Sequence, residues 1–300
     1  MKKYLYSIVF ATLILMSTTV VKASNEVYYT NRENVEMTER EYNNLLGLGF
    51  TEKQSYRMDR NTFLENKDLE GTVLNEEGKY YKETTIMRNG IKKYLREEIT
   101  LEEALEEVKL QSQNPTKGAP AGNYYDGVFA TTIIYVKNKI VGLSSTFMRF
   151  KTDVEWFTIP SDRYNDIIGI GIIPDEVQIY LSAVVFREDW ETTGGVSGYT
   201  TVCSPKSNSM GGSAIFTLPG GSLSQLESYV YFNVQKQNGV GTLYNLHSSG
   251  NYAHATSNVS HSDLYNHYTM DYATGIWVDS TYGTHYTTTS PAYASFVGTW

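Results

Sequence analysis

The sequence predicts an α+β protein in which a small helical module with a β-hairpin precedes an all-β, jelly-roll-like sandwich. Three observations predict this arrangement: helix-capping patterns before residue 113, a Pro- and Gly-containing break, and β-branched and aromatic segments from residue 123 onward. Charged residues are dense before the break, whereas Tyr, Thr, Ser and Gly dominate after it. We therefore expect domains at residues 24–113 and 123–300, joined by a linker at 114–122.

The first 23 residues have the three parts of a secretory signal peptide. Lys2 and Lys3 form a positive n-region, residues 6–21 form an apolar run, and Ala23 ends a Val-Lys-Ala cleavage site. A retained anchor fits less well, because the run falls short of the roughly 20 residues that span a bilayer. We expect cleavage after Ala23 and release of a secreted, extracellular protein with no stable membrane anchor.

Three short helices are expected at the start of the mature chain. Thr38 with Glu41, and Thr51 with Gln54, form capping boxes, in which the Thr hydroxyl and the N3 side chain satisfy each other's backbone amides. Asp59 can cap a third helix. The helical spacing of the apolar residues behind these caps predicts a compact three-helix unit.

A hairpin and a fourth helix complete this first part. Residues 80–88 and 91–100 are strand-like and are joined by Asn89-Gly90, the pair that a type I′ turn favours. Thr100 with Glu103 then begins an amphipathic helix whose polar face carries four Glu residues. We interpret that acidic run as a solvated helix face that the helix dipole favours, with a cation site as the alternative.

From residue 122 onward the sequence is typical of short β-strands. Strand-like segments are predicted at residues 128–136, 139–150, 153–158, 166–173, 178–186, 214–218 and 229–236. A break is expected at Lys137-Asn138, and the polar, Gly-rich stretch at residues 192–213 is predicted to be a long loop.

A second hairpin is predicted around Asn238-Gly239, with residues 229–236 as its first strand. This pairing would place His247 opposite Val230. One face of the first strand is apolar, whereas the other carries Tyr229 and Tyr231, so we expect one face packed and one face in water.

Two segments carry a resemblance to known proteins: residues 37–51 (MTEREYNNLLGLGFT) and residues 158–171 (TIPSDRYNDIIGIG). Both are similar to segments of uncharacterised secreted proteins of Gram-positive bacteria that join a helical N-terminal module to a Tyr/Ser-rich C-terminal domain. The resemblance implies export and a two-part layout, and it assigns no activity or site.

The charge balance bears on the class of partner. Cleavage would remove three Lys and take Lys+Arg from 25 to 22 against 33 Asp+Glu, so the formal net charge moves from −8 to −11. Nucleic-acid binding needs a basic footprint and is not expected, and attraction to anionic lipid is disfavoured. The single cysteine, Cys203, cannot form an internal disulfide. A buried small side chain is expected, with intermolecular pairing or a reactive thiol as alternatives.

Aromatic residues give the main functional hypothesis, because Tyr and Trp offer rigid amphipathic surfaces to sugars and proteins. The candidate ligand contacts are Tyr229, Tyr231, Tyr244, Tyr265 and Trp277. We therefore expect an exported, non-enzymatic binding or adhesion protein whose ligand is a glycan or an extracellular protein. The alternative is that these tyrosines simply occupy half-exposed strand positions, which suit them.

Two further functions stay open as alternatives. All five histidines lie in the last quarter of the chain, which would suit a metal-dependent secreted hydrolase, although their spacing matches no ligand motif. Residues 237–262 carry no charged side chain of the Asp, Glu, Lys or Arg type and could form the membrane hairpin of a pore-forming toxin. The sequence contains no recognised nucleophile, zinc-ligand or nucleotide-binding motif, so we expect no catalytic residue, no metal and no cofactor.

Overall fold

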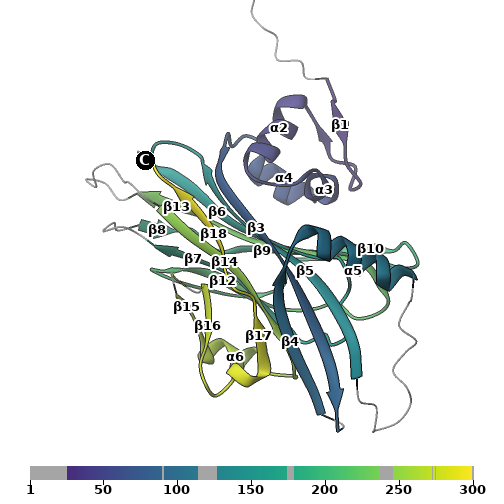
Figure 1. Cartoon of the computed structure of the whole chain (residues 1–300). Coiled ribbons are helices and arrows are strands. Elements are labelled where there is room, and N and C mark those ends of the chain that lie inside the picture. Colours follow the sequence, from purple (N-terminus) through teal and green to yellow (C-terminus); the bar gives the residue numbers. More distant parts are fainter. Residues whose placement is uncertain are drawn as a thin grey trace, which may run out of the picture.

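The computed structural model describes residues 26–89, 91–113, 127–173, 179–236, 246–271, 273 and 275–298, with the backbone alone for residues 179–181. Two antiparallel sheets face each other as a β-sandwich, and the helices pack outside it (Figure 1). The predicted α+β class with a dominant sandwich is confirmed. The predicted signal peptide, the predicted linker and Tyr244 lie outside the described residues.

The larger sheet has eight strands. In spatial order they are β10 (Ser197–Thr200), β9 (Val185–Thr192), β13 (Leu223–Lys236), β6 (Phe147–Trp156), β5 (Gly127–Gly142), β3 (Thr72–Arg88) and β4 (Ile91–Ile99), with β8 (Ile179–Leu181) also paired to β13. The second sheet has six strands. They are β11 (Ser204–Asn208), β12 (Gly211–Thr217), β7 (Asn165–Ile173), β14 (Leu246–Ala255) and β17 (Tyr286–Thr288), with β18 (Ala292–Phe296) also paired to β14.

Smaller elements surround the sandwich. The N-terminal module contains β1 (Tyr29–Thr30), β2 (Glu36–Met37), α2 (Glu39–Gly47), α3 (Glu52–Arg57) and α4 (Arg60–Asn66). Elsewhere lie α5 (Leu101–Gln113), α6 (His261–His267), β15 (Tyr268–Asp271), β16 (Gly275–Val278) and the 3-10 turn η1 (Gly283–His285). Among the described residues, no helix combines the length and apolar character that a membrane crossing requires.

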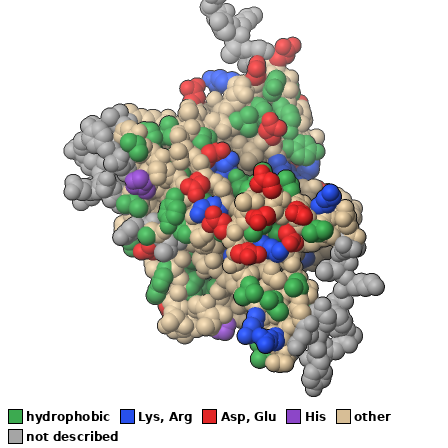
Figure 2. Space-filling model, in the orientation of Figure 1, with side chains coloured by type: hydrophobic (Ala, Val, Ile, Leu, Met, Phe, Trp, Pro, Cys, Tyr) green, Lys and Arg blue, Asp and Glu red, His purple; other side chains and the backbone are tan. Residues whose placement is uncertain are grey.

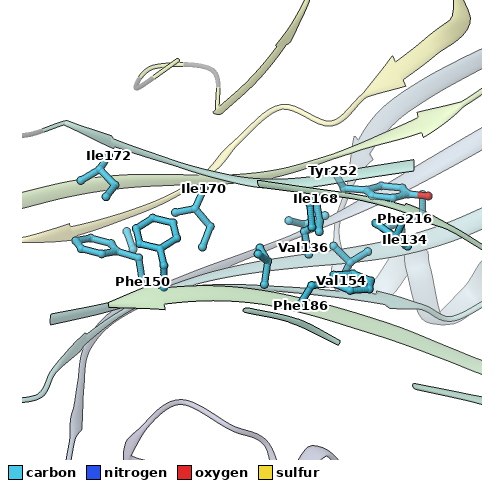
Figure 3. Packing of buried hydrophobic residues seen from close by; sticks show 14 of the residues in the cluster. Ile134, Val136, Phe150, Val154, Ile168, Ile170, Ile172, Phe186, Phe216 and Tyr252 are labelled. Carbon is cyan, nitrogen blue, oxygen red and sulfur yellow. The ribbon is translucent and has the colours of Figure 1, made fainter. Parts of the chain in front are cut away.

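The apolar core lies between the two sheets. Along β7, Ile168, Ile170 and Ile172 all point inward, toward a layer that includes Phe150 and Val154 of β6 (Figure 3). All five side chains are fully buried or nearly so. Successive strand residues point to opposite faces, so the two-residue spacing of these isoleucines is what places β7 against the other sheet.

The predicted helix starts are confirmed. Thr38 and Thr51 each form a reciprocal capping box with the residue three positions later. Asp59 accepts hydrogen bonds from the amides of Asn61 and Thr62 and so caps α4. These caps depend only on residues within one turn of the helix, which is why the local sequence predicts them.

The first hairpin is also confirmed, but its place in the fold differs from the prediction. Arg88 is opposite Ile91, and Asn89 has the positive φ of 51° that the predicted turn requires. β3 also pairs with β5 along most of its length. The hairpin was expected to belong with the helices, yet it extends the larger sheet, because β3 covers the edge that β5 would otherwise leave unpaired.

Two other strand predictions are wrong. β5 continues through Lys137-Asn138, where a break was expected, because Asn138 points into the sandwich and donates a 3.0 Å hydrogen bond to Ser248 Oγ. The stretch 192–213, predicted to be a loop, contains β10 and β11.

The turn of the predicted second hairpin, with residues 237–245, lies outside the described residues, but its pairing does not continue into the strands on either side. β13 and β14 lie in different sheets: β13 pairs with β6, β8 and β9, whereas β14 pairs with β7, β17 and β18. His247 lies opposite Ile173 and Ser295 rather than Val230. Of the stretch that could refold into a membrane hairpin, residues 246–255 form β14 and residues 261–262 begin α6, and the pore-forming alternative stays a hypothesis.

Candidate binding site

The structure separates the aromatic residues proposed as ligand contacts. Tyr229 and Tyr231 share one face of β13, as the alternation predicts, but the N-terminal module covers that face. The two tyrosines are only 1% and 4% exposed. Phe50 packs edge-on against both, with ring centroids 5.6 and 5.9 Å away. The predicted site is therefore corrected, because a dissolved ligand cannot reach these two side chains in this structure.

The covered face of the sheet is charged, and the module supplies polar partners to these charges. Lys139 Nζ lies 2.8 Å from Asp153 Oδ2 and donates to the carbonyl of Gly49, while Gln54 Nε2 donates to Asp153 Oδ1 at 2.8 Å. Burial would raise the pKa of Asp153, but Lys139 and Lys151 hold it well below its ordinary value. Burial lowers the pKa of Lys151 to about 7. These buried polar contacts tie α2 and α3 to the sandwich.

Trp277 has the opposite environment and is 52% exposed. It lies on β16 opposite Thr269 of β15. Alternation turns Met270 and Ile276 toward the second sheet, where they are buried, and turns Trp277 and Thr269 outward. The β15–β16 hairpin therefore presents a tryptophan on the outer surface of the sandwich, next to α6 (Figure 1).

Hydrogen-bonding groups flank this tryptophan. Asp279 lies two residues after Trp277, and its Oδ2 is 2.7 Å from Nδ1 of His267. That hydrogen bond lowers the pKa of the Asp279 carboxyl. The ring of Tyr282 lies 4.5 Å from the His267 ring, centroid to centroid. A half-exposed aromatic ring beside a fixed carboxylate and imidazole can stack on one face of a ligand and accept or donate hydrogen bonds at its edge.

Gly169 of β7 allows the β15–β16 hairpin to pack closely against the second sheet. A Cβ on Gly169 would lie 2.7 Å from Cγ1 of Ile276 and 2.9 Å from Cε of Met270. The missing side chain lets β15 and β16 approach the sheet closely. Gly169 therefore determines how closely the β15–β16 hairpin packs against the second sheet.

Tyr265 is exposed near the same hairpin. It lies on α6, which Ser260 caps by accepting from the amide of Asp263, and it is 40% exposed. Lys206 Nζ lies 5.0 Å from the centre of its ring and donates to its carbonyl at 2.7 Å. Of the five proposed contacts, the structure therefore places Tyr265 and Trp277 at the surface of adjoining elements.

The five histidines have separate sets of partners. His247 contacts Ser295, His254 contacts Asp166 and Tyr252, His261 contacts Ser204 and Thr217, His267 contacts Asp279, and His285 contacts Ser257. Within the described part of the chain, no group of three or more His, Cys, Asp or Glu residues is arranged to hold a metal ion. The hydrolase alternative thus gains no geometric support.

A buried ionisable network, not expected from the sequence, lies between the sheets. Asp166 of β7 accepts from Nδ1 of His254 at 3.0 Å, and Nε2 of the same imidazole lies 3.7 Å from Glu83 of β3. Burial would lower the pKa of His254, but the two carboxylates raise it overall. Arg96 forms an ion pair with Glu83. The network links the larger sheet to the second sheet and lies away from solvent.

Glu188 of β9 points into the same interlayer space. It is fully buried, and neither carboxyl oxygen has a hydrogen-bond partner among the described residues. Burial, with the negative charges of Asp166 and Asp189, raises its pKa to about 9. The alternation of the strands gave a partial signal, because Glu188 lies on the same face as Phe186, and Asp166 on the same face as Ile168. Alternation alone, however, does not show which face of a strand is buried.

An acidic pocket of about 330 Å³ lies between α5 and the β3–β4 hairpin. Its lining residues are Lys82, Glu97, Ile99, Glu103, Glu106, Glu107 and Leu110. Lys82 forms an ion pair with Glu107, and Glu103 caps α5 through Thr100. Figure 2 shows acidic side chains gathered in this region of the surface. Two of the four acids are thus already engaged in holding the helix in place.

No protein-family model, curated protein or solved structure matches the chain. The resemblance to secreted Gram-positive proteins therefore stays an expectation.

Proposed function

We propose that this chain is an exported glycan-binding protein whose contact surface is centred on Trp277. Export is supported by the Lys-rich start, the apolar run and the cleavage pattern ending at Ala23. Binding without chemistry is supported by a surface that offers a stacking ring and polar edges.

The exposure of Trp277 is the observation that carries this proposal. Trp277 leaves 52% of its surface in water, although the other face of its hairpin is packed. A ligand that covers the indole removes apolar surface from water, which favours binding. The C–H face of a sugar ring can stack on the indole, while its hydroxyl groups bond to Asp279, His267 or Thr269. We propose a glycan rather than a protein, because the surface as described consists of one exposed indole and three polar side chains, whereas a stable protein interface buries about 800 Å² on each partner.

A glycan-array screen of the mature protein tests the proposal. We expect one glycan class to bind and Trp277→Ala to lose that signal, while Tyr265→Ala has a smaller effect. Tyr56→Ala is the matched control, since Tyr56 is a 46% exposed tyrosine on α3 of the N-terminal module. The proposal fails if no glycan binds, or if the Trp277 and Tyr56 variants give the same signal as the wild type.

A further inference from the structure

The tip of the β3–β4 hairpin is a second exposed surface, formed by strands other than β16, which carries Trp277. β3 and β4 extend to the lower end of the molecule in Figure 1, where the turn at Asn89 joins them. β5 pairs with β3 as far as Gly127, opposite Met87, so three strands end close together.

Large apolar side chains are exposed at this tip. Ile91 is 63% exposed, Leu95 57% and Val128 53%. The strand register explains why they share a face: Ile86 is paired with Lys93 on one side and with Val128 on the other. Ile91 and Leu95 are both two residues from Lys93, so alternation turns all three the same way. Single exposed apolar residues are common, but three on the end of one sheet form a patch.

Two cations lie within the same patch. Arg88 is opposite Ile91, and Lys93 lies between Ile91 and Leu95 on their face of the strand. Both are exposed, and neither has a carboxylate partner among the described residues. Lys92, by contrast, forms an ion pair with Asp162 at 2.6 Å. Figure 2 shows basic side chains beside hydrophobic ones at the lower end of the molecule.

Charge is distributed unevenly along the outer face of the β3–β4 hairpin. Arg88 and Lys93 lie toward the turn, whereas Glu97, on the same face as Lys93, lies toward α5 and its acidic pocket. The chain as a whole has a formal net charge of −8. Charges more than about 8–10 Å away are largely screened at physiological salt. A negative surface that meets the tip end-on therefore interacts mainly with Arg88 and Lys93.

We propose that this hairpin tip, defined by Arg88, Ile91, Lys93, Leu95 and Val128, docks on a membrane surface that contains anionic lipid. The apolar side chains enter the boundary between headgroups and acyl chains, and the cations contact the phosphates. The apolar component favours a membrane over a nucleic acid, whose phosphate backbone needs cations alone. The contact is peripheral and lies outside the proposed glycan surface.

The size of the effect follows from the few groups involved. Each cation near an anionic surface contributes about a fivefold increase in partitioning, and burial of a large aliphatic side chain contributes about tenfold or more. Binding should therefore be reversible, should weaken as salt is added, and should need both the apolar and the cationic groups.

Co-sedimentation of the mature protein with vesicles tests the proposal. We expect binding to vesicles of phosphatidylcholine with phosphatidylserine, and much weaker binding to phosphatidylcholine alone. The double variant Arg88→Ser/Lys93→Ser should bind the anionic vesicles at least tenfold less well, and Ile91→Ser/Leu95→Ser should lose binding at all salt concentrations. These side chains are exposed, so unchanged circular dichroism and melting temperature should show that both variants fold.

The control is Val202→Ser/Val297→Ser, which removes two apolar side chains that are 79% and 77% exposed elsewhere. This control should bind like the wild type. The proposal is overturned if the wild type ignores anionic vesicles, or if the control loses as much binding as the tip variants. Binding equal on neutral and anionic vesicles would also overturn it, because the cations would then contribute nothing.

Discussion

Glu188 should make the stability of the protein fall as pH rises from acid to neutral. The carboxyl is fully buried and unpartnered among the described residues, and its pKa is raised to about 9, first by burial and then by Asp166 and Asp189. In the unfolded chain a glutamate titrates near 4.3. Between these two values the folded state holds a proton that the unfolded state has released.

The sign and the size of this pH dependence follow from the linkage between proton binding and folding. Where the folded state binds one more proton, the free energy of unfolding falls by about 1.4 kcal/mol for each pH unit of increase. The stability conferred by the neutral carboxyl is complete below about pH 4.3 and is lost by about pH 9. From pH 5 to pH 8 the decrease attributable to Glu188 is on the order of 4 kcal/mol.

Glu188→Gln keeps the shape of the side chain and removes its proton equilibrium. Urea denaturation of wild type and variant at several pH values between 5 and 8 gives the difference in their free energies of unfolding. We expect the free energy of unfolding of the variant to rise relative to that of the wild type as pH rises. The contributions of other titrating groups are the same in both proteins and cancel in the difference. Glu98→Gln, at a half-exposed site on β4, should show no such trend. Parallel stability curves for Glu188→Gln and wild type would refute the reasoning.

Two further predictions concern architecture. A fragment of residues 121–300 should be insoluble or melt far below the mature chain, because it lacks β3 and exposes the edge of β5; a cooperative melt close to that of the mature chain would contradict this. Gly169→Ala should destabilise the protein by about 1–3 kcal/mol, because the new methyl group meets Ile276 and Met270. Thermal melts should show no comparable loss for Gly220→Ala, where nothing lies within 4 Å.

The sequence predicted those parts of the fold that depend on neighbouring residues. The caps at Thr38 and Thr51 and the turn at Asn89 each involve a few adjacent positions, so their chemistry is visible in the chain. The two faces of β13 were predicted for the same reason, since alternation is a local property.

Pairing over long distances was not predictable in the same way. Asn138 was interpreted as a turn residue, because the neighbouring sequence does not show that it donates a hydrogen bond to Ser248 of the other sheet. An Asn-Gly pair between β13 and β14 suggested a hairpin, yet the two strands belong to opposite sheets. Tyr229 and Tyr231 were assigned to water because the docking of the N-terminal module on their face has no signature within β13.

The proposed binding surface follows only in part from the sequence. Trp277 was proposed from its residue type alone. The positions of Thr269, His267 and Asp279 depend on the β15–β16 register and on the His267–Asp279 hydrogen bond, which the sequence does not show. The buried network around His254 and Glu188 required two sheets to be brought together and was missed.

Calorimetric titration of residues 24–300 with the glycan class that binds best tests the central claim most directly. The dissociation constants of wild type, Trp277→Ala and the Tyr56→Ala control are compared under one set of conditions. Covering a half-exposed indole predicts a loss of about tenfold or more for Trp277→Ala and no change for Tyr56→Ala. Equal dissociation constants for wild type and the Trp277 variant would place the glycan elsewhere and contradict the account.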